Sequence, residues 1–586
     1  MMKEENSNAR SMIMNILLAA INAKYIHSNL AVYSLKAYAK EITEQIVIAE
    51  YTINQQTDDI LQDIYKRKPD ILCFSCYIWN IRYVEELVRE VKKILPEIII
   101  WVGGPEVSYD AKHVLEQLPE LAGVMKGEGE KTFAELMRYY AKKEGNLNKI
   151  EGITYREANG EICENEWRPV MDLSEVPFVY EDMSLFEHKI IYYESSRGCP
   201  FRCSYCLSSV DKCLRFRNIE LVKKELQFFI DKKVPQVKFV DRTFNCKHEH
   251  SMAIWNYIHE HDNGITNFHF EVSADLLNEE ELELMSKMRP GLIQLEIGVQ
   301  STNPDTIREI RRTMRLDKVA QNVAKINQYK NIHQHLDLIA GLPYENYESF
   351  GKSFDEVYAM EPEQLQLGFL KVLKGSYMDE NKEAYGLVYK NLPPYEVLST
   401  KWLPYKDVLR LKGIEEMVEV YYNSRQFCYT LPQLIKHFNG PFAFFEALSI
   451  FYEEEGLLML NQSRTSRYEI LLKFAEKIDE ANLEKYRQLL IMDYYIRENA
   501  KTRPVFAGEE TCSKEFAKDF YDREEEERRY LQKGYDGYDR RKLRKMTHIE
   551  VFDYDVVGTM EEKKVIILFD YLNRSPLNHQ ATSYQL

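Results

Sequence analysis

The chain of 586 residues lacks any long apolar run. A membrane-spanning helix needs roughly 18 to 20 consecutive apolar residues, and none of the apolar runs reaches that length. The first residues, MMKEENSNARSMIMNILLAA, include acidic side chains and no small-residue cleavage site, unlike a secretory signal peptide. We therefore expect a cytoplasmic protein with no membrane partner.

Cysteines are too few for a disulfide framework. Ten cysteines in a chain of this size, without a signal peptide, are candidates for free thiols and metal ligands. Three of them cluster near residue 200. A buried free thiol is the default expectation for the scattered others, which are Cys73, Cys76, Cys163, Cys213, Cys246, Cys428 and Cys512.

Positive charge is also in short supply. The chain has 77 Lys and Arg against 93 Asp and Glu, a net charge of −16, which opposes non-specific binding to nucleic acid. One basic cluster, Arg540 to Lys545, follows the acidic run Asp522 to Glu527. We interpret the two as a solvated mixed-charge helix, with a docking patch for a nucleic acid such as tRNA as the alternative.

The length and composition that remain indicate a multi-domain α/β protein. Hydrophobic residues make up 45% and charged residues 29%, which is ordinary for globular proteins, and 586 residues predict two to four domains. In residues 1–148, the apolar runs NILLAA, QIVIAEY, DILCFS, EIIIWVGG and AGVMKG alternate with helical segments. This pattern predicts a doubly wound, Rossmann-like domain whose ligand lies at the carboxyl ends of parallel strands.

Three further regions follow. Residues 149–185 predict a hairpin with Asn159 and Gly160 at its turn, serving as a linker. Residues 186–375 contain six repeated strand and helix segments, which predict a partial (β/α)6, TIM-like barrel with its site at the strand carboxyl ends. Residues 376–586 predict a mostly helical domain of no readable function, ending in short strands.

The strongest chemical signal is RGCPFRCSYC, from Arg197 to Cys206. The thiolates of Cys199, Cys203 and Cys206 can bind three irons of a cubane cluster and leave the fourth iron open to a substrate. These cysteines are therefore the candidate metal ligands and catalytic residues. A structural zinc site is the alternative, but it needs a fourth Cys or His nearby, and Cys213 is seven residues further on.

This cysteine spacing, with the aromatic Tyr205 before the last cysteine, resembles the signature of the radical S-adenosylmethionine (SAM) superfamily. The resemblance implies a [4Fe–4S] cluster whose open iron binds SAM. It also implies anaerobic, reductive cleavage of SAM to a 5′-deoxyadenosyl radical. An electron donor such as flavodoxin or ferredoxin would reduce the cluster.

Other SAM contacts are harder to find, because the Gly-Gly-Glu stretch common in this superfamily is missing. VDRTFN stands in its place, and we expect Asp241 to face the barrel mouth and hold a polar atom of SAM or substrate. Polar groups within apolar strands are costly to bury unless they are paired. A ligand is one possible partner, and a salt bridge to Lys238 or Arg242 inside the barrel is the alternative. The candidates are Glu271, Ser273, Glu296, Gln300 and Asp337. The sequence GLP, which begins at Gly341, resembles a loop that lies near the adenine of SAM in many radical SAM enzymes.

The N-terminal domain resembles the cobalamin-binding domain of the B12-dependent branch of this superfamily. Glycines there would let the backbone approach the cofactor. The positions carried over are Ser75, Gly103, Gly104, Pro105, Gly127 and Gly129. The Asp-x-His-x-x-Gly motif of many B12 proteins is absent, because Tyr25 and Leu30 flank His27 in its place. We therefore expect His27 to make loop hydrogen bonds or a substrate contact rather than to bind cobalt.

The resemblance covers about residues 14 to 375, and the rest of the chain resembles an uncharacterised domain that follows the barrel in one subgroup. Cobalamin beside a radical-generating barrel implies a methyltransferase that acts on an unactivated carbon of a small-molecule or other substrate. Radical rearrangement or cyclisation without methyl transfer is one alternative. A non-catalytic corrinoid or redox sensor is another.

Overall fold

The computed structural model describes residues 14–209, 213–458 and 460–586. The chain forms two compact units. The first holds the chain up to Leu284 together with Arg308–Met314 and Phe369–Lys401, and the second holds Met285–Ile307, Arg315–Gly368 and Trp402–Leu586. Among the described residues, no helix has both the length and the apolar character needed to cross a bilayer.

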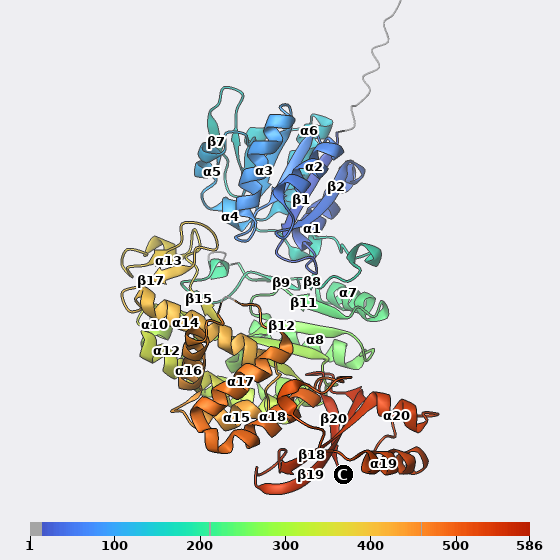
Figure 1. Ribbon diagram of the computed structural model, residues 1–586. Helices are drawn as coiled ribbons and strands as arrows, with labels where there is room; N and C mark the ends of the chain where they lie inside the picture. The colour runs from blue at the N-terminus through green and yellow to red at the C-terminus, as the bar shows by residue number, and fades with distance from the viewer. Residues whose placement is uncertain (1–13, 210–212, 459) are drawn as a thin grey trace, which may run out of the picture. The chain divides into compact units, whose positions relative to one another are not determined.

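The first unit begins with a seven-stranded sheet in the order β2-β1-β3-β4-β5-β6-β7 (Figure 1). Five strands are parallel. They are β1 (Ile16–Asn22), β2 (Ile46–Thr52), β3 (Ile71–Ser75), β4 (Ile99–Gly103) and β5 (Gly123–Met125). The predicted doubly wound domain is confirmed, and the five apolar runs in the sequence are its strands.

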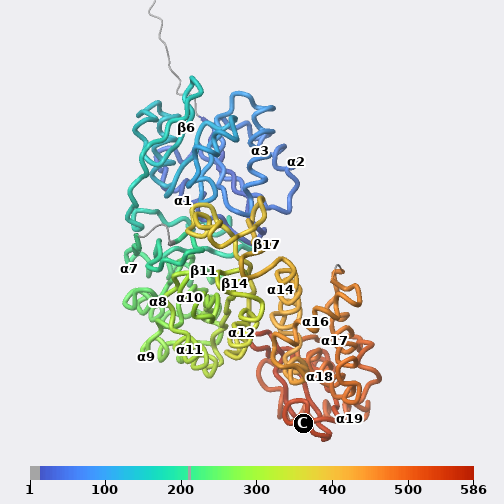
Figure 2. Tube along the Cα trace, turned by 90° about the vertical axis from the view of Figure 1, so that its left-hand side faces the viewer, coloured from blue at the N-terminus to red at the C-terminus, as the bar shows by residue number. Residues whose placement is uncertain are grey.

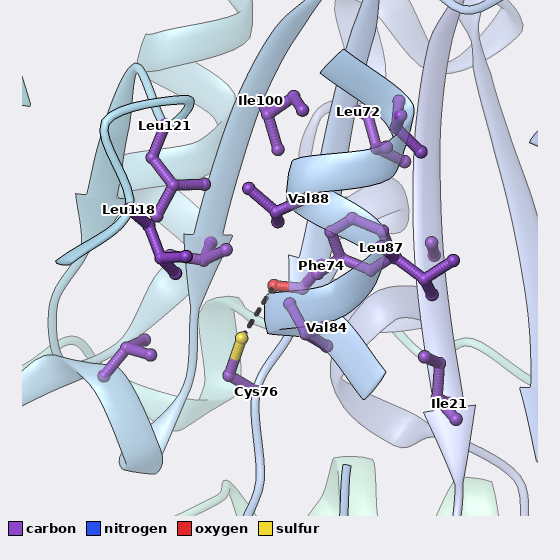
Figure 3. Packing of buried hydrophobic residues seen from close by; sticks show 14 of the residues in the cluster. Ile21, Leu72, Phe74, Cys76, Val84, Leu87, Val88, Ile100, Leu118 and Leu121 are labelled. Atoms are coloured by element: carbon purple, nitrogen blue, oxygen red, sulfur yellow. Dashed lines mark hydrogen bonds between the residues drawn. The ribbon is translucent and has the colours of Figure 1, made fainter. Parts of the chain in front are cut away.

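Alternate strand residues build two cores, one on each face of this sheet, as the period of two in a strand requires. One core packs α2 (Thr57–Arg67), α3 (Ile81–Ile94) and α5 (Ala111–Gln117) against the sheet. Figure 3 shows Val84, Leu87 and Val88 of α3 over Leu72 and Phe74 of β3. The other core packs α1 (Leu30–Tyr38) and α6 (Gly129–Lys142).

The hairpin that the sequence predicts as a linker belongs to this sheet. Strands β6 (Ile153–Arg156) and β7 (Ile162–Glu164) pair with each other, and β6 pairs antiparallel with β5. Tyr155 lies opposite Gly123, and Ile153 lies opposite Met125. The sheet edge that β5 would otherwise expose is thereby covered, so the hairpin completes the domain rather than merely connecting it.

The first unit also contains three parallel strands of the barrel region, β8 (Ile191–Tyr193), β11 (Gln236–Phe239) and β12 (Asn267–Val272). Helix α7 (Ile219–Asp231) lies between β8 and β11 in the chain, and α8 (His248–Glu260) lies between β11 and β12. After β8, the short strands β9 (Ser196–Arg197) and β10 (Arg215–Phe216) pair antiparallel and enclose the segment with the three cysteines.

The second unit contains the other three strands, β13 (Ile293–Gln300), β14 (His333–Ala340) and β15 (Gln364–Phe369), side by side in that order. Helix α11 (Leu316–Tyr329) connects β13 to β14, which are parallel, and α12 (Tyr347–Tyr358) connects β14 to β15. The six strands of the predicted partial barrel are therefore all present, two fewer than in a full TIM barrel.

The C-terminal part of the second unit is mostly helical, as predicted. The helices are α14 (Tyr405–Met417), a π-helical turn (Val418–Asn423), α15 (Thr430–Ile435), α16 (Pro441–Glu454), α17 (Arg464–Asp479), α18 (Leu483–Tyr495), α19 (Lys514–Glu527) and α20 (Arg540–Met546). An antiparallel sheet of β18 (Thr547–Tyr554), β19 (Glu562–Arg574) and β20 (Ala581–Gln585) ends the chain. Figure 2 shows this part in orange and red. Arg540 pairs with Asp522 at 2.6 Å, as a mixed-charge surface would.

The predicted boundary at residue 376 differs from the structure. Phe369–Lys401, which includes α13 (Tyr377–Glu380) and the small ribbon β16 (Val388–Tyr389) and β17 (Val397–Ser399), belongs to the first unit. Lys374 Nζ lies 3.3 Å from Glu106 Oε1 of the N-terminal domain, and the hydroxyl of Tyr395 donates to the same carboxylate. We call this segment the 369–401 strap.

Candidate functional site

A cavity of about 1150 Å³ lies at the carboxyl ends of the N-terminal strands, within the first unit. Its lining includes all six residues that the sequence assigns to the N-terminal ligand, namely Ser75, Gly103, Gly104, Pro105, Gly127 and Gly129. This volume exceeds the range typical of ligand pockets, about 300 to 1000 Å³. The cavity therefore has room for a large cofactor.

Other walls of the cavity come from segments that the sequence did not assign to it. Tyr192 of β8, Lys238 of β11 and Glu271 of β12 line it from the barrel strands. Trp167 lines it from the segment after the hairpin. Tyr77 and Trp79, in the loop after β3, stack with ring centroids 4.4 Å apart and an interplanar angle of 5°.

The glycines of the cavity serve two different purposes. Gly104 has φ +116, and a Cβ there would lie 2.5 Å from the carbonyl oxygen of Cys76, so the backbone itself requires glycine. A Cβ on Gly103 would meet Met125 at an ordinary 3.4 Å, and one on Gly127 would meet the Trp167 ring at 3.5 Å. Gly104 is therefore needed for the fold, whereas Gly103 can take a side chain without backbone strain.

His27 lies at the junction of the N-terminal domain with β8. Its Nδ1 shares a hydrogen bond with the hydroxyl of Tyr192, and the two rings stack with centroids 5.7 Å apart. Ile190 N donates to Ile26 O at 2.7 Å, and Ser28 Oγ donates to Ile190 O at 3.0 Å. Burial lowers the pKa of His27, with Lys24 and Lys238 adding to the effect. His27 thus hydrogen-bonds to a barrel strand, and it also lines the cavity.

The cysteine segment is anchored at its base and at its turn. Gly198 has φ +91, and a Cβ there would lie 2.6 Å from Cys213 O, so only glycine fits beside the β9–β10 ladder. Ser204 N donates to Ile310 O at 2.9 Å, and Met378 N donates to Ser204 O at 3.1 Å. Two distant segments, one of them the 369–401 strap, therefore fix the turn between Cys203 and Cys206.

The three thiols differ in their surroundings. Cys203 is buried, whereas Cys199 and Cys206 are half-buried. Arg312 Nη1 lies 3.7 Å from Cys203 Sγ and donates to the Tyr205 hydroxyl at 3.1 Å. Burial raises the pKa of Cys203, and the nearby guanidinium of Arg312 partly offsets that rise. Cys199 Sγ lies 3.7 Å from Thr243 Oγ1.

The chemistry of the donor set suits a cluster better than one ion. Cys199, Cys203 and Cys206 offer three thiols from one segment. A structural zinc site takes four protein ligands, whereas the three thiolates of a cubane bind separate irons and leave one iron open. The donor set therefore fits an iron–sulfur cluster.

Asp241 does not face an open barrel mouth, which corrects the expectation from the sequence. It is buried, with Oδ1 accepting from Ser195 Oγ at 2.7 Å and from Ser196 Oγ at 2.6 Å, and Oδ2 accepting from Ser195 N at 3.0 Å. Burial raises its pKa to about 6. Its hydrogen bonds hold the strand that leads into the cysteine segment, so Asp241 is a positioning residue.

Ser273 is likewise occupied by a local turn. Its hydroxyl donates to Asp275 Oδ1 at 2.8 Å, and its backbone N–H donates to Asn245 Oδ1 at 2.9 Å. The structure places Ser273 at the N-terminus of the turn after β12. Its hydroxyl is therefore engaged in the turn, unlike Glu271, which lines the cavity.

In the second unit, three polar side chains gather on neighbouring strands. Glu296 of β13 lies opposite His335 of β14, and His335 Nε2 is 3.0 Å from Asp337 Oδ1. Gln300 ends β13 with φ +74, and Gly341 directly follows β14 with φ +88. The sequence singled out Glu296 and Asp337 separately, and the strand register brings them together.

A cluster of ion pairs joins the cavity wall to the cysteine segment. Arg197 pairs with Glu128 at 3.0 Å, with Glu130 at 2.8 Å and with Glu194 at 2.7 Å. Glu128 also binds Arg215. Glu128 and Glu130 flank Gly129 at the start of α6, so this helix N-terminus contributes both to the cavity and to the base of the cysteine segment.

Comparison with known families accounts for most of the chain. Residues 16–137 match the B12 binding domain, residues 193–357 match the radical SAM superfamily, and residues 383–569 match DUF4080, a protein family of unknown function. The chain thus carries, in this order, a B12-binding domain, a radical SAM domain and a DUF4080 domain. Its cofactors are cobalamin, a [4Fe–4S] cluster and SAM.

Several relatives of this B12-dependent radical SAM chain are curated. The cobalamin-dependent radical SAM methyltransferase TokK of Streptomyces tokunonensis is 25% identical over 344 residues, covering 55% of this chain and 50% of TokK. The hopanoid C-3 methylase of Methylococcus capsulatus is 28% identical, covering 44% of this chain and 51% of the methylase. An anaerobic magnesium-protoporphyrin IX monomethyl ester cyclase of Synechocystis is 23% identical, covering 47% and 56%. The chain thus spans about half the length of these relatives.

Solved structures show the same fold. The cobalamin-dependent SAM radical enzyme OxsB, with aqua-cobalamin and SAM bound, superposes with a TM-score of 0.57 at 17% identity. The match covers 82% of this chain and 80% of OxsB. At that identity the likeness concerns the fold of this B12-dependent radical SAM chain and not its activity.

Sequence reasoning missed several residues of the site. Arg197 stands inside the cysteine motif itself, and Glu128 stands between two glycines already singled out, so motif position was an available signal for both. Arg312 gave no such signal, because it lies far along the chain from Cys203 and reaches it only through the fold.

Proposed function

We propose that the chain is a cobalamin-dependent radical SAM methyltransferase that methylates an unactivated carbon of its substrate. The observation that carries this proposal is a single cavity lined by the glycine-bearing strand ends of the B12-binding domain and by the first barrel strands. Both the cavity and the cysteine segment lie within one compact unit. In this proposal the substrate binds in that unit, where it meets both cofactors.

In this proposal the residues divide by task. Cys199, Cys203 and Cys206 hold the cluster, and the residues at the strand ends of the N-terminal domain hold cobalamin. When bound, the cluster supplies the electron that cleaves SAM, and cobalamin supplies the methyl carrier. The buried position of Cys203 limits the access of water to that cluster ligand.

The charged side chains on the barrel strands bind the polar parts of SAM or substrate. In the first unit these are Lys238 and Glu271, which face the cavity. In the second unit they are Glu296, His335 and Asp337, whose grouped oxygen and nitrogen atoms suit an amino or hydroxyl group as well as a cation. Gln300 and Gly341 belong to the same set of candidate contacts.

A rearrangement or cyclisation without methyl transfer is the second candidate, because three relatives are named cyclases. The relatives named methyltransferase or methylase favour methyl transfer.

Reduction of the cluster in the cytoplasm requires an electron donor, for which flavodoxin or ferredoxin has suitable chemistry.

The test is anaerobic purification of the whole chain, reconstitution with iron, sulfide and hydroxocobalamin, and reduction with dithionite in the presence of SAM. We expect both 5′-deoxyadenosine and S-adenosylhomocysteine from corrinoid-loaded protein. If deoxyadenosine is the only product, rearrangement replaces methyl transfer as the proposed reaction. If an iron-loaded, corrinoid-loaded preparation gives neither product, a missing substrate and a non-catalytic sensor are to be separated next.

A further inference from the structure

Arg312 places a buried positive charge against the cysteine segment. Its Nη1 donates to Cys203 Sγ at 3.7 Å and to the Tyr205 hydroxyl at 3.1 Å. Cys203 is only 7% exposed, so bulk water does not screen this contact effectively. Both residues lie in the first unit, because Arg308–Met314 returns to it.

The backbone on either side holds Arg312 in place. Ile310 O accepts a hydrogen bond from Ser204 N at 2.9 Å, which ties this segment to the residue after Cys203. Glu309 Oε1 accepts from the Tyr385 hydroxyl at 2.6 Å, and the Arg311 guanidinium lies 3.7 Å from the centre of the Tyr377 ring. The 369–401 strap therefore supports the segment from a second side.

Hydrogen bonds to cysteine sulfur and nearby charge are among the main factors that set the potential of an iron–sulfur cluster. The reduced cluster carries one more negative charge than the oxidised cluster. A cation that donates to a sulfur ligand therefore stabilises the reduced form more, and the reduction potential rises.

We propose that Arg312 is a positioning residue of the cluster, whose N–H···S hydrogen bond to Cys203 raises the reduction potential. The inference rests on the proposed function, because it requires a cluster on the three cysteines. It adds a residue from outside the cysteine motif, which controls how readily the electron donor can reduce the cluster. Tyr205, which accepts from the same Nη1, orients the guanidinium.

The test is a redox titration of the reconstituted whole chain, in which the EPR signal of the reduced cluster is measured at each solution potential. Wild type is compared with Arg312→Gln, Arg312→Lys and Arg311→Gln. Arg311 is the matched control, because it is an exposed neighbour that stacks on Tyr377 instead of contacting sulfur. Iron and sulfide contents are measured for every sample.

For Arg312→Gln we expect the ratio of reduced to oxidised cluster at a fixed solution potential to fall about tenfold, equivalent to about 59 mV for one electron. Arg312→Lys keeps the charge but loses the planar fork, so a smaller fall is expected. Arg311→Gln removes a contact of the segment with the strap but none with sulfur, so its potential should lie much closer to that of wild type.

An unchanged potential in an iron-replete Arg312→Gln protein would overturn the inference. If that variant retains no iron, Arg312→Lys decides, because its potential must still lie below that of wild type. Wild type that holds no cluster would instead overturn the proposed function, so the two failures are distinguishable.

Discussion

Arg197 lies directly opposite Arg215 in the β9–β10 ladder that closes the cysteine segment. Two like charges in that position repel each other, and directly opposed like charges destabilise a strand pair. Glu128 binds both arginines, from the loop after β5 that also lines the cavity. The base of the cysteine segment is therefore held together by a carboxylate from the B12-binding domain.

Replacing Glu128 should loosen this base. Glu128→Gln leaves two partly buried guanidiniums facing each other, and we expect a loss of roughly 3 kcal/mol in stability together with faster loss of iron. Thermal unfolding and the rate of iron release to a chelator measure the two effects. Glu130→Gln is the control, because among the described residues Glu130 forms its ion pair with Arg197 alone, and Arg197 keeps two other carboxylates.

A double variant tests the cause. Removing the second charge in Glu128→Gln/Arg215→Gln relieves the repulsion, so part of the iron retention should return. Iron loss that is equal in the Glu128 and Glu130 variants, with no recovery in the double variant, would show that the like-charge pair is not the reason.

The cavity can be filled at one position without straining the backbone. We expect Gly103→Leu to reduce hydroxocobalamin binding at least tenfold while iron content stays at the wild-type level, because the new side chain occupies ligand space. Corrinoid absorbance after gel filtration gives the bound fraction. Gly103→Ala, whose Cβ would lie 3.4 Å from Met125, should bind nearly normally. Full corrinoid loading of the leucine variant would place the cofactor elsewhere.

The cysteines can be separated into ligands and bystanders. Cys203→Ala should leave thermal unfolding within about 1 kcal/mol of wild type and abolish cleavage of SAM, since a cubane needs all three thiolates. Cys246→Ala is the matched control, because Cys246 lies outside the motif and burial raises its pKa to about 11. Deoxyadenosine and iron assays distinguish the two. Retained cleavage in the Cys203 variant contradicts the ligand assignment.

Glu345 predicts a pH-dependent stability in the second unit. Its Oε1 accepts from Ser301 Oγ at 2.6 Å and Ser353 Oγ at 3.0 Å, while Oε2 has no hydrogen-bond partner among the described residues. Burial raises its pKa from 4.5 to about 7. The folded chain therefore holds this proton where the unfolded chain has lost it, so the stability contribution is present below pH 4.5 and is lost as the pH rises to about 7.

Glu345→Gln, which mimics the protonated carboxyl, should remove this dependence. The melting temperature of the variant should rise relative to that of wild type between pH 4.5 and 7, and the difference should then level off. Glu348→Gln is the control on an exposed residue nearby. A constant difference across that range would mean that Glu345 is ionised throughout.

Much of the fold follows from local sequence. Strands such as Ile71–Ser75 are short apolar runs between amphipathic helices, and the cysteine spacing is readable because all three thiols belong to one loop. Long-range pairing is not readable in this way. Sequence polarity alone suggested that Asp241 faces a ligand, whereas its partners, Ser195 and Ser196, become visible only when β8 and β11 lie side by side.

The chain passes between the two units after Leu284, Ile307, Met314, Gly368 and Lys401. Neither unit is therefore a single stretch of sequence, and the residues that support the cysteine turn, Ile310 and Met378, lie before β14 and after β15 in the sequence. An exchange of the C-terminal domain between family members would preserve these supports only if the junction falls after Lys401. A junction at residue 376 would give the recipient cysteine loop a strap that evolved for another protein.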